Sequence, residues 1–382
     1  MKIAVHAARS IVPALLLVVL VSTSCSDKAI NYYNEGIEAA ERDDLEGAIE
    51  AWQKSLKYRP DDPETRYNLG LAYLKTGQYK EAEKQFFEAT IIAPDDPDTQ
   101  YGLGKSLEEQ GKFSEAKRAY ERAVNQDPYC FLALLGLASC SIKEGQPKSA
   151  ENYGVQATRI EPRNRDANLI LAEAYFQNGD YLAAYGQLLS IAKYEKNDPE
   201  IQLLLGKATY KRRMYNDALE SLRKARSNGL ATSELFLFLG LTQIELEDYN
   251  EAEKYFRLAI YKDQDNWDAW MGLGEAYIKM EKWNEAHEAY STAAALQPDR
   301  SESRLGVGLA LLNAGRFPEA IETFQNIVRA GNPPPRTYYY LGHAHWRLGD
   351  PESARVAFEN FLDVWEGDPV LRDEVRAILE SL

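Results

Sequence analysis

Residues 69–94 read LGLAYLKTGQYKEAEKQFFEATIIAP, and residues 103–128 read LGKSLEEQGKFSEAKRAYERAVNQDP, 34 positions later. The two stretches share Leu-Gly, then Gly, Ala, an aromatic residue, Ala and Pro at the same spacing. Alanine recurs at this period along the whole chain, at positions 48, 82, 116, 150, 184, 218, 252, 286, 320 and 354. A second series, twelve residues upstream, holds only Gly or Ala. Small residues on both sides of a turn allow two antiparallel helices to approach closely, so each period predicts one helical hairpin.

The period and the matched residues resemble the tetratricopeptide repeat, a helix-turn-helix unit of 34 residues. The match includes Leu69-Gly70, Tyr73, Gly77, Ala82 and Phe86, but the closing proline is missing from several units. The resemblance implies an all-α superhelical solenoid of about ten hairpins over residues 29–368. Residues 369–382 follow Pro369 with an apolar stripe and are expected to form a C-terminal capping helix.

The amino-terminal segment resembles a bacterial lipoprotein signal. Lys2 and Arg9 precede the apolar run 11–21, which is too short to span a bilayer of about 30 Å, and small residues lead into Cys25. The sequence therefore predicts a signal peptide at 1–24, lipid attachment at Cys25 and a short tether at 25–28. Cleavage after Ser24 by an ordinary signal peptidase is the alternative. Lipidation would place the protein in the bacterial envelope, with the outer membrane facing the periplasm favoured.

Catalytic, metal and cofactor sites are not expected. Gly104-Lys105-Ser106 lacks the first glycine of a phosphate-binding loop and falls within an expected helix. His343 and His345 lie about 200° apart on a helix and cannot share a metal. The chain is therefore predicted not to be an enzyme. Its formal net charge of −15 argues against nucleic acid as a partner, and the sequence does not set the oligomeric state.

In tetratricopeptide-repeat proteins the first helix of each hairpin lines a concave groove that binds partners. In this chain the middle repeats carry an apolar surplus on that helix, which predicts a partner-binding surface. Its residues are Leu169, Ile170, Phe176, Leu203, Leu204, Tyr210, Leu237, Phe238 and Ile244. The alternative is that neighbouring hairpins cover these side chains.

These features predict a membrane-anchored scaffold that binds envelope proteins or peptides in its groove. The alternative function is a small-ligand or glycan-binding accessory lipoprotein of an envelope transport or polysaccharide-export system. A peptide groove should present separated apolar anchors, whereas a ligand site should be one closed pocket with converging polar groups.

Overall fold

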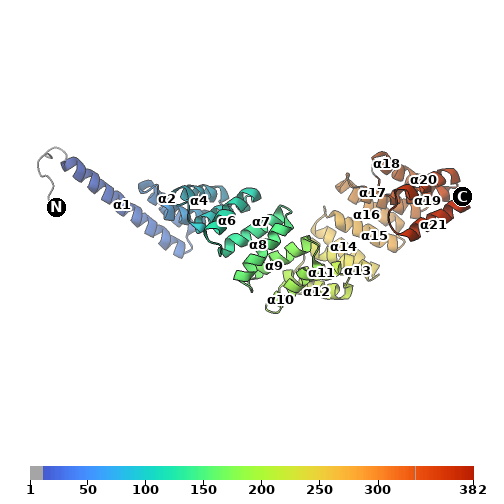
Figure 1. Ribbon diagram of the computed structural model, residues 1–382, viewed down its shortest axis with the longest axis horizontal. Helices are drawn as coiled ribbons and strands as arrows, with labels where there is room; N and C mark the ends of the chain where they lie inside the picture. The colour runs from blue at the N-terminus through green and yellow to red at the C-terminus, as the bar shows by residue number, and fades with distance from the viewer. Residues whose placement is uncertain (1–11, 332) are drawn as a thin grey trace. The chain divides into compact units, whose positions relative to one another are not determined.

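The computed structural model describes the backbone of residues 12–331 and 333–382, and the side chains of 27–331 and 333–382. Within these ranges the chain forms α-helices and no strands (Figure 1). The helices fall into two compact units, Met1–Ile191 and Ala192–Leu382. The predicted all-α solenoid of helical hairpins is confirmed.

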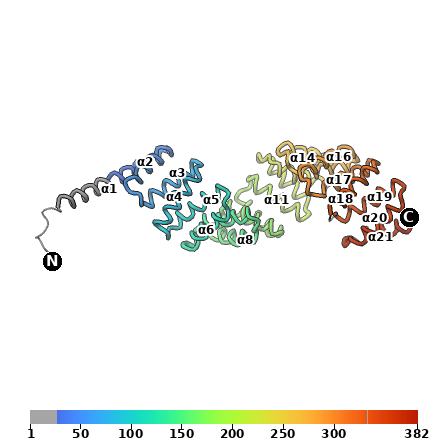
Figure 2. Tube along the Cα trace, turned by 90° about the horizontal axis from the view of Figure 1, so that it is seen from above, coloured from blue at the N-terminus to red at the C-terminus, as the bar shows by residue number. Residues whose placement is uncertain are grey.

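The first unit contains five hairpins, and Figure 2 shows α3 to α6 following one another in chain order. The odd-numbered first helix packs against the even-numbered second helix in the hairpins α1–α2, α3–α4, α5–α6 and α7–α8, and the first helices α3, α5, α7 and α9 touch in succession. The helices are α1 (Val12–Glu41), α2 (Leu45–Tyr58), α3 (Pro63–Lys75), α4 (Tyr79–Ile92), α5 (Pro97–Glu109), α6 (Phe113–Gln126), α7 (Phe131–Lys143), α8 (Pro147–Ile160), α9 (Arg165–Gln177) and α10 (Tyr181–Ala192).

The second unit repeats the pattern with five further hairpins and a final single helix. Its helices are α11 (Pro199–Lys211), α12 (Tyr215–Ser227), α13 (Ser233–Glu245), α14 (Tyr249–Lys262), α15 (Trp267–Lys279), α16 (Trp283–Leu296), α17 (Ser301–Asn313), α18 (Phe317–Arg329), α19 (Arg336–Leu348), α20 (Pro351–Val364) and α21 (Pro369–Ser381). The last helix packs on α20 and buries Val375 against Phe358 and Phe361. It therefore covers the apolar side of the last hairpin, as expected of a cap.

The small residues hold the two helices of each hairpin together. All ten alanines of the 34-residue series are exposed by 1% or less. In the upstream series, a Cβ added at Gly104 would lie 2.6 Å from the ring of Tyr120, and one at Gly240 would lie 2.7 Å from Phe256. A ring from the second helix thus occupies the space that a larger residue on the first helix would need.

Polar side chains begin many of the helices. Asp62 Oδ2 accepts a hydrogen bond from the Thr65 backbone N–H at 3.1 Å, and Pro63 stands in the first turn. Asp96 caps α5 through the N–H of Thr99 in the same way. Helix capping therefore explains Asp62 and Asp96, which directly precede Pro63 and Pro97.

The amino-terminal helix differs from the sequence expectation, which placed its start at Ala29. Helix α1 begins at Val12 and runs through Cys25 without a break. Pro13 lies in its first turn, where a missing backbone N–H costs no helical hydrogen bond. Lys2 and Arg9 lie outside the described residues, as does the side chain of Cys25, so the signal peptide and lipid site stay predictions. Among the helices described, none is both long enough and apolar enough to cross a membrane.

Candidate partner-binding surface

The nine residues predicted to bind a partner are divided between the two units. Leu169, Ile170 and Phe176 lie on α9 of the first unit, where they are half-buried. The other six lie on α11 and α13 of the second unit. Each group is therefore a candidate surface by itself.

Much of the second group belongs to the hydrophobic core. Leu203 and Leu237 are only 7% and 9% exposed, and Phe238 and Ile244 pack against the same core cluster. The ring of Tyr210 meets that of Phe238 edge-on at 5.7 Å, and burial raises the pKa of Tyr210 to about 12. Leu204 is half-buried. Packing between hairpins thus accounts for several of these side chains without a partner.

The size of the apolar side chain at one position of the first helix is related to the size of the side chain sixteen residues earlier. A Cβ added at Gly102, Gly136, Gly272 or Gly306 would collide with an aromatic ring sixteen residues earlier, on the second helix of the preceding hairpin. Ile170 in the first unit and Phe238 in the second occupy the same repeat position, but the residues sixteen before them are Gly154 and Leu222. A larger side chain on the first helix therefore accompanies a smaller one on the preceding second helix. This compensation keeps the space between hairpins filled.

A pocket lies where a large residue at this repeat position is followed, one repeat later, by glycine. Phe238 on α13 fills its own position, whereas the equivalent residue on α15 is Gly272, and a pocket of about 480 Å³ lies beside them. We call it the α13–α15 pocket. It is lined by Lys211, Glu234, Leu237, Phe238, Leu241, Asp268, Met271, Gly272, Glu275 and Tyr290, all from the second unit.

The α13–α15 pocket combines apolar walls with several carboxylates. Glu234 is paired with Lys207, whose Nζ lies 2.7 Å from Oε1 of Glu234 and 5.8 Å from the centre of the Phe238 ring. Asp268 lies one repeat after Glu234, in the first turn of α15. Glu275 is exposed at the rim, and desolvation by the neighbouring helices raises its pKa; the charge of Lys279 acts in the opposite direction, and that of Glu245 adds to the rise. Such a site favours a ligand that brings positive charge.

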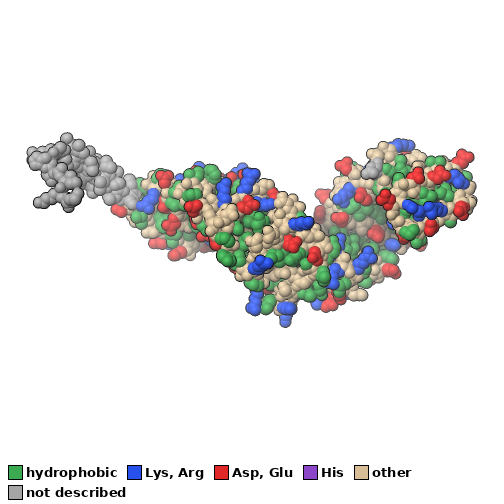
Figure 3. Space-filling model, viewed as in Figure 1, with side chains coloured by type: hydrophobic (Ala, Val, Ile, Leu, Met, Phe, Trp, Pro, Cys, Tyr) green, Lys and Arg blue, Asp and Glu red, His purple; other side chains and the backbone are tan. Residues whose placement is uncertain are grey.

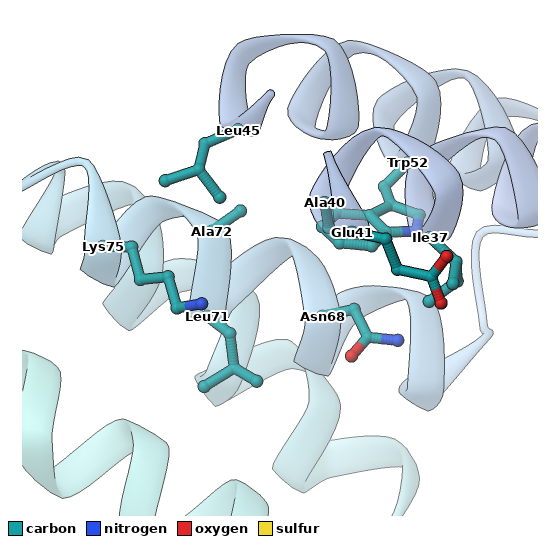
Figure 4. A pocket seen from close by; sticks show the side chains of 9 residues that line it. All are labelled: Ile37, Ala40, Glu41, Leu45, Trp52, Asn68, Leu71, Ala72 and Lys75. Carbon is teal, nitrogen blue, oxygen red and sulfur yellow. The ribbon is translucent and has the colours of Figure 1, made fainter. Parts of the chain in front are cut away.

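A smaller pocket of about 310 Å³ lies in the first unit (Figure 4). Figure 4 shows Ile37, Ala40 and Glu41 of α1, Leu45 and Trp52 of α2, and Asn68, Leu71, Ala72 and Lys75 of α3 around it. The ring nitrogen of Trp52 donates to the backbone oxygen of Tyr33 at 3.2 Å, which fixes this side chain as part of the wall. With one lining acid, Glu41, and one lining base, Lys75, this pocket has no excess of charge.

The sequence features that resembled chemical sites lie in ordinary helical positions. Gly104-Lys105-Ser106 falls in the middle of α5, and the Lys105 ammonium pairs with Glu109 at 2.7 Å. His343 lies among the rings of Tyr339, Trp346 and Phe358. Among the side chains of residues 27–331 and 333–382, no three His, Cys, Asp or Glu are grouped as metal ligands.

Models of the tetratricopeptide repeat match most of the chain. The matched residues are 38–77, 63–96, 107–153, 141–208, 233–266, 271–334 and 335–360. The chain belongs to the tetratricopeptide-repeat family. No catalytic family is indicated, and repeats of this kind support a role in binding other proteins.

Individual relatives of this tetratricopeptide-repeat chain are distant. An uncharacterized protein of Methanocaldococcus jannaschii is 32% identical over 65 residues, which is 17% of this chain and 76% of the relative. A tetratricopeptide repeat protein from Parabacteroides merdae has a crystal structure that superposes with a TM-score of 0.52 at 15% identity. This superposition covers 65% of this chain and 99% of the other. At this identity the likeness concerns the fold alone.

Sequence reasoning missed the charged part of the α13–α15 pocket. Glu234 and Asp268 stand in first turns, where acidic residues are explained by the helix dipole, so they drew no attention as site residues. The available signal was Leu241, which occupies on α13 the position that Lys207 has on α11. Asp268 therefore has no counterpart of the lysine that pairs with Glu234.

Proposed function

We propose that this protein is an exported scaffold, anchored to the bacterial outer membrane by a lipid at Cys25, which holds protein partners in an envelope assembly. The first helices of its hairpins provide the binding surfaces. The α13–α15 pocket is the observation that carries the proposal, because it combines apolar anchors with carboxylates on neighbouring first helices.

The surface charge supports a protein partner rather than nucleic acid. The net charge is −15, and on the face shown in Figure 3 acidic, basic and hydrophobic side chains are interspersed. A nucleic-acid site needs a continuous basic stripe to neutralise phosphates. A mixed acidic surface suits the polar rim of a protein interface.

The α13–α15 pocket also favours the alternative function, a small-ligand or glycan-binding accessory lipoprotein of an envelope transport or polysaccharide-export system. Its polar groups converge from three first helices, as a ligand site requires. The two functions differ in what remains bound after purification. A scaffold retains proteins that crosslink to α11, α13 and α15, whereas an accessory subunit of this kind retains a small molecule.

The anchor can be tested by mass spectrometry of the mature amino terminus purified from native membranes. We expect an acylated Cys25 as the first residue, and Cys25→Ser should release the protein into the soluble fraction. A mature chain that starts elsewhere, or that has an unmodified Cys25, would contradict anchoring.

The scaffold role can be tested by crosslinking in membranes, followed by purification of the complex. The matched comparison uses Leu204→Asp with Phe238→Asp, against Lys75→Ala with Lys279→Ala. We expect the apolar pair to abolish recovery of a partner of micromolar affinity, because each buried apolar side chain contributes about 1.5–3 kcal/mol. Circular dichroism distinguishes two outcomes that contradict the site. A folded variant that still binds shows that these residues do not contact the partner, and an unfolded variant shows that they belong to the core.

A further inference from the structure

The α13–α15 pocket has a composition that selects one class of partner. We infer that it takes a segment of a partner protein that inserts a Lys or Arg side chain beside Asp268 and Glu275, with an adjacent apolar side chain on Phe238. This inference rests on the proposed scaffold function, and it adds the chemistry of the segment that is recognised.

The apolar part of the pocket supplies the anchor. Leu237, Phe238, Leu241 and Met271 line it, and its volume of about 480 Å³ falls within the range of about 300–1,000 Å³ for ligand sites in proteins. Gly272 keeps one side of it open, because a Cβ there would lie 2.4 Å from the ring of Phe256. The absence of a side chain at this point of the wall is therefore required by the packing of the second helix of the preceding hairpin.

The charged part sets the preference for a cation. Three carboxylates line the pocket against one ammonium, that of Lys211 on α11. Glu234 is already neutralised by Lys207. Within the described part of the chain, no Lys, Arg or His forms an ion pair with Asp268 or Glu275, and the charge of Lys279 on the same helix acts only on Glu275 from beyond that distance. A basic side chain from a partner would supply the missing charge.

The chain itself displays the contact that the partner would make. The Lys207 ammonium binds Glu234 and lies over the face of Phe238, so a carboxylate and an aromatic ring together hold a cation. One repeat later, Asp268 takes the place of Glu234, but Leu241 takes the place of Lys207 and Gly272 that of Phe238, so the carboxylate remains without the cation and the ring. The basic side chain of the partner would supply, beside Leu241, the positive charge that Lys207 supplies one repeat earlier.

The test measures fluorescence anisotropy on the full chain with two pools of labelled peptides of equal length. The pools differ only in a fixed central residue, Arg or Glu, and share Leu on either side of it. We expect the Arg pool to bind about tenfold more tightly than the Glu pool, and the difference to shrink as salt rises from about 50 to about 300 mM.

The decisive variant is Asp268→Asn with Glu275→Gln, which removes two charges while keeping side-chain size. The matched control is Asp98→Asn with Glu173→Gln, which changes the same repeat positions in the first unit. We expect the pocket variant to lose about tenfold in affinity for the Arg pool, and the control to lose less than about twofold. Circular dichroism and denaturant unfolding confirm that both variants are folded.

Three results would overturn the inference: equal binding of the two pools, an unchanged affinity of the pocket variant, or binding of butylammonium as tight as that of the Arg pool. The last would identify a site for small cations. Failure of the scaffold function is distinguishable, because the peptide preference is measured on the purified chain. A partner crosslinked in membranes that binds the pocket variant normally would contradict the inference and leave the scaffold function intact.

Discussion

The turns inside the hairpins of the two units share one backbone conformation but differ in the residues that adopt it. Every 34 residues, the turn between first and second helix contains a residue with positive φ. In the first unit these residues are Asp43, Gly77, Gly111, Gly145 and Gly179, and in the second unit they are Arg213, Glu247, Glu281, Gly315 and Gly349. The left-handed position is therefore set by the geometry of the hairpin, and glycine is only one residue that can fill it.

Because three successive turns of the second unit have a residue other than glycine at this position, backbone strain is concentrated there. A left-handed conformation costs a non-glycine residue about 1–2 kcal/mol. Arg213, Glu247 and Glu281 have φ of 61°, 62° and 58°, and they follow α11, α13 and α15, the three first helices that line the α13–α15 pocket. Strained residues persist where surrounding contacts determine the backbone, and such residues often gather near functional sites.

The largest expected effect concerns a feature that the two units share. Ala116 and Ala218 occupy the same repeat position, and both are fully buried. Replacing either with Leu should lower the free energy of unfolding by roughly 1–3 kcal/mol, because the closely packed helices have no room for three further carbon atoms. Denaturant unfolding followed by circular dichroism measures this cost.

Equal costs at Ala116 and Ala218 would show that helix contact is the same in both units and only the turns differ. Because each repeat contacts only its neighbours, hydrogen exchange should increase first in the substituted hairpin and the two beside it. Uniform exchange over the whole chain, or unchanged stability, would contradict this account of the alanine series.

A smaller effect is expected when a turn glycine of the first unit is replaced. Gly77 has φ of 74°, and an added Cβ would meet nothing within 4 Å. Gly77→Ala should therefore destabilise the chain by about 1 kcal/mol through backbone conformation alone. Thermal unfolding measures the change, with Gly186→Ala as a control, since Gly186 also lies in open space but is helical. The control should stabilise slightly, and equal losses in both variants would contradict the conformational explanation.

The reverse substitution should stabilise the second unit. Glu247→Gly removes the left-handed penalty of about 1–2 kcal/mol, but the greater freedom of glycine in the unfolded chain returns about 0.5–1 kcal/mol. We expect a net gain of about 0.5–1 kcal/mol in denaturant unfolding. Glu245→Gly, two residues earlier and inside α13, should instead lose stability. A loss for Glu247→Gly would show that its side chain makes contacts that outweigh the strain.

The fold could be predicted because each hairpin repeats the same close contact. The alanine series and the upstream Gly or Ala series fix the period, and the structure places both where helices meet. The start of α1 could not be predicted from that period, since the apolar run before Ala29 is also able to form a helix and continues it to Val12.

The candidate site was harder to predict because an apolar residue on a first helix has two possible surroundings. Leu237 and Phe238 are adjacent on α13 and both line the α13–α15 pocket, yet Leu237 is buried in the core whereas Phe238 is only partly buried against it. The room available at the position of Phe238 depends on the size of the residue sixteen positions earlier, which lies on another helix. The ion pair of Lys207 with Glu234 joins residues that lie 27 positions apart, in two neighbouring hairpins. No local sequence pattern indicates such a pair.

The smallest expected effect is a dependence on pH at the capped end of the second unit. His343 on α19 packs edge-on against Phe358 of α20 at 5.2 Å between ring centres, and its Nε2 is buried without a hydrogen-bond partner. Burial lowers the pKa of His343 from its ordinary value, as does the charge of Arg347, while Glu374 of α21 acts in the opposite direction. The unfolded chain therefore binds a proton at this side chain more tightly than the folded chain does.

Because the unfolded chain binds this proton more tightly, a fall in pH destabilises the folded chain at His343. The contribution of His343 to stability is fully present above its unfolded pKa of about 6.5, and it is lost as the pH falls through that value towards the lower pKa of the folded state. We expect His343→Phe to reduce the loss of stability between about pH 7 and about pH 5. His345→Gln is the control, since His345 lies on the same helix and its Nδ1 is 3.1 Å from Asp350. An identical pH profile for His343→Phe and the unaltered chain would show that other groups govern acid stability at the cap.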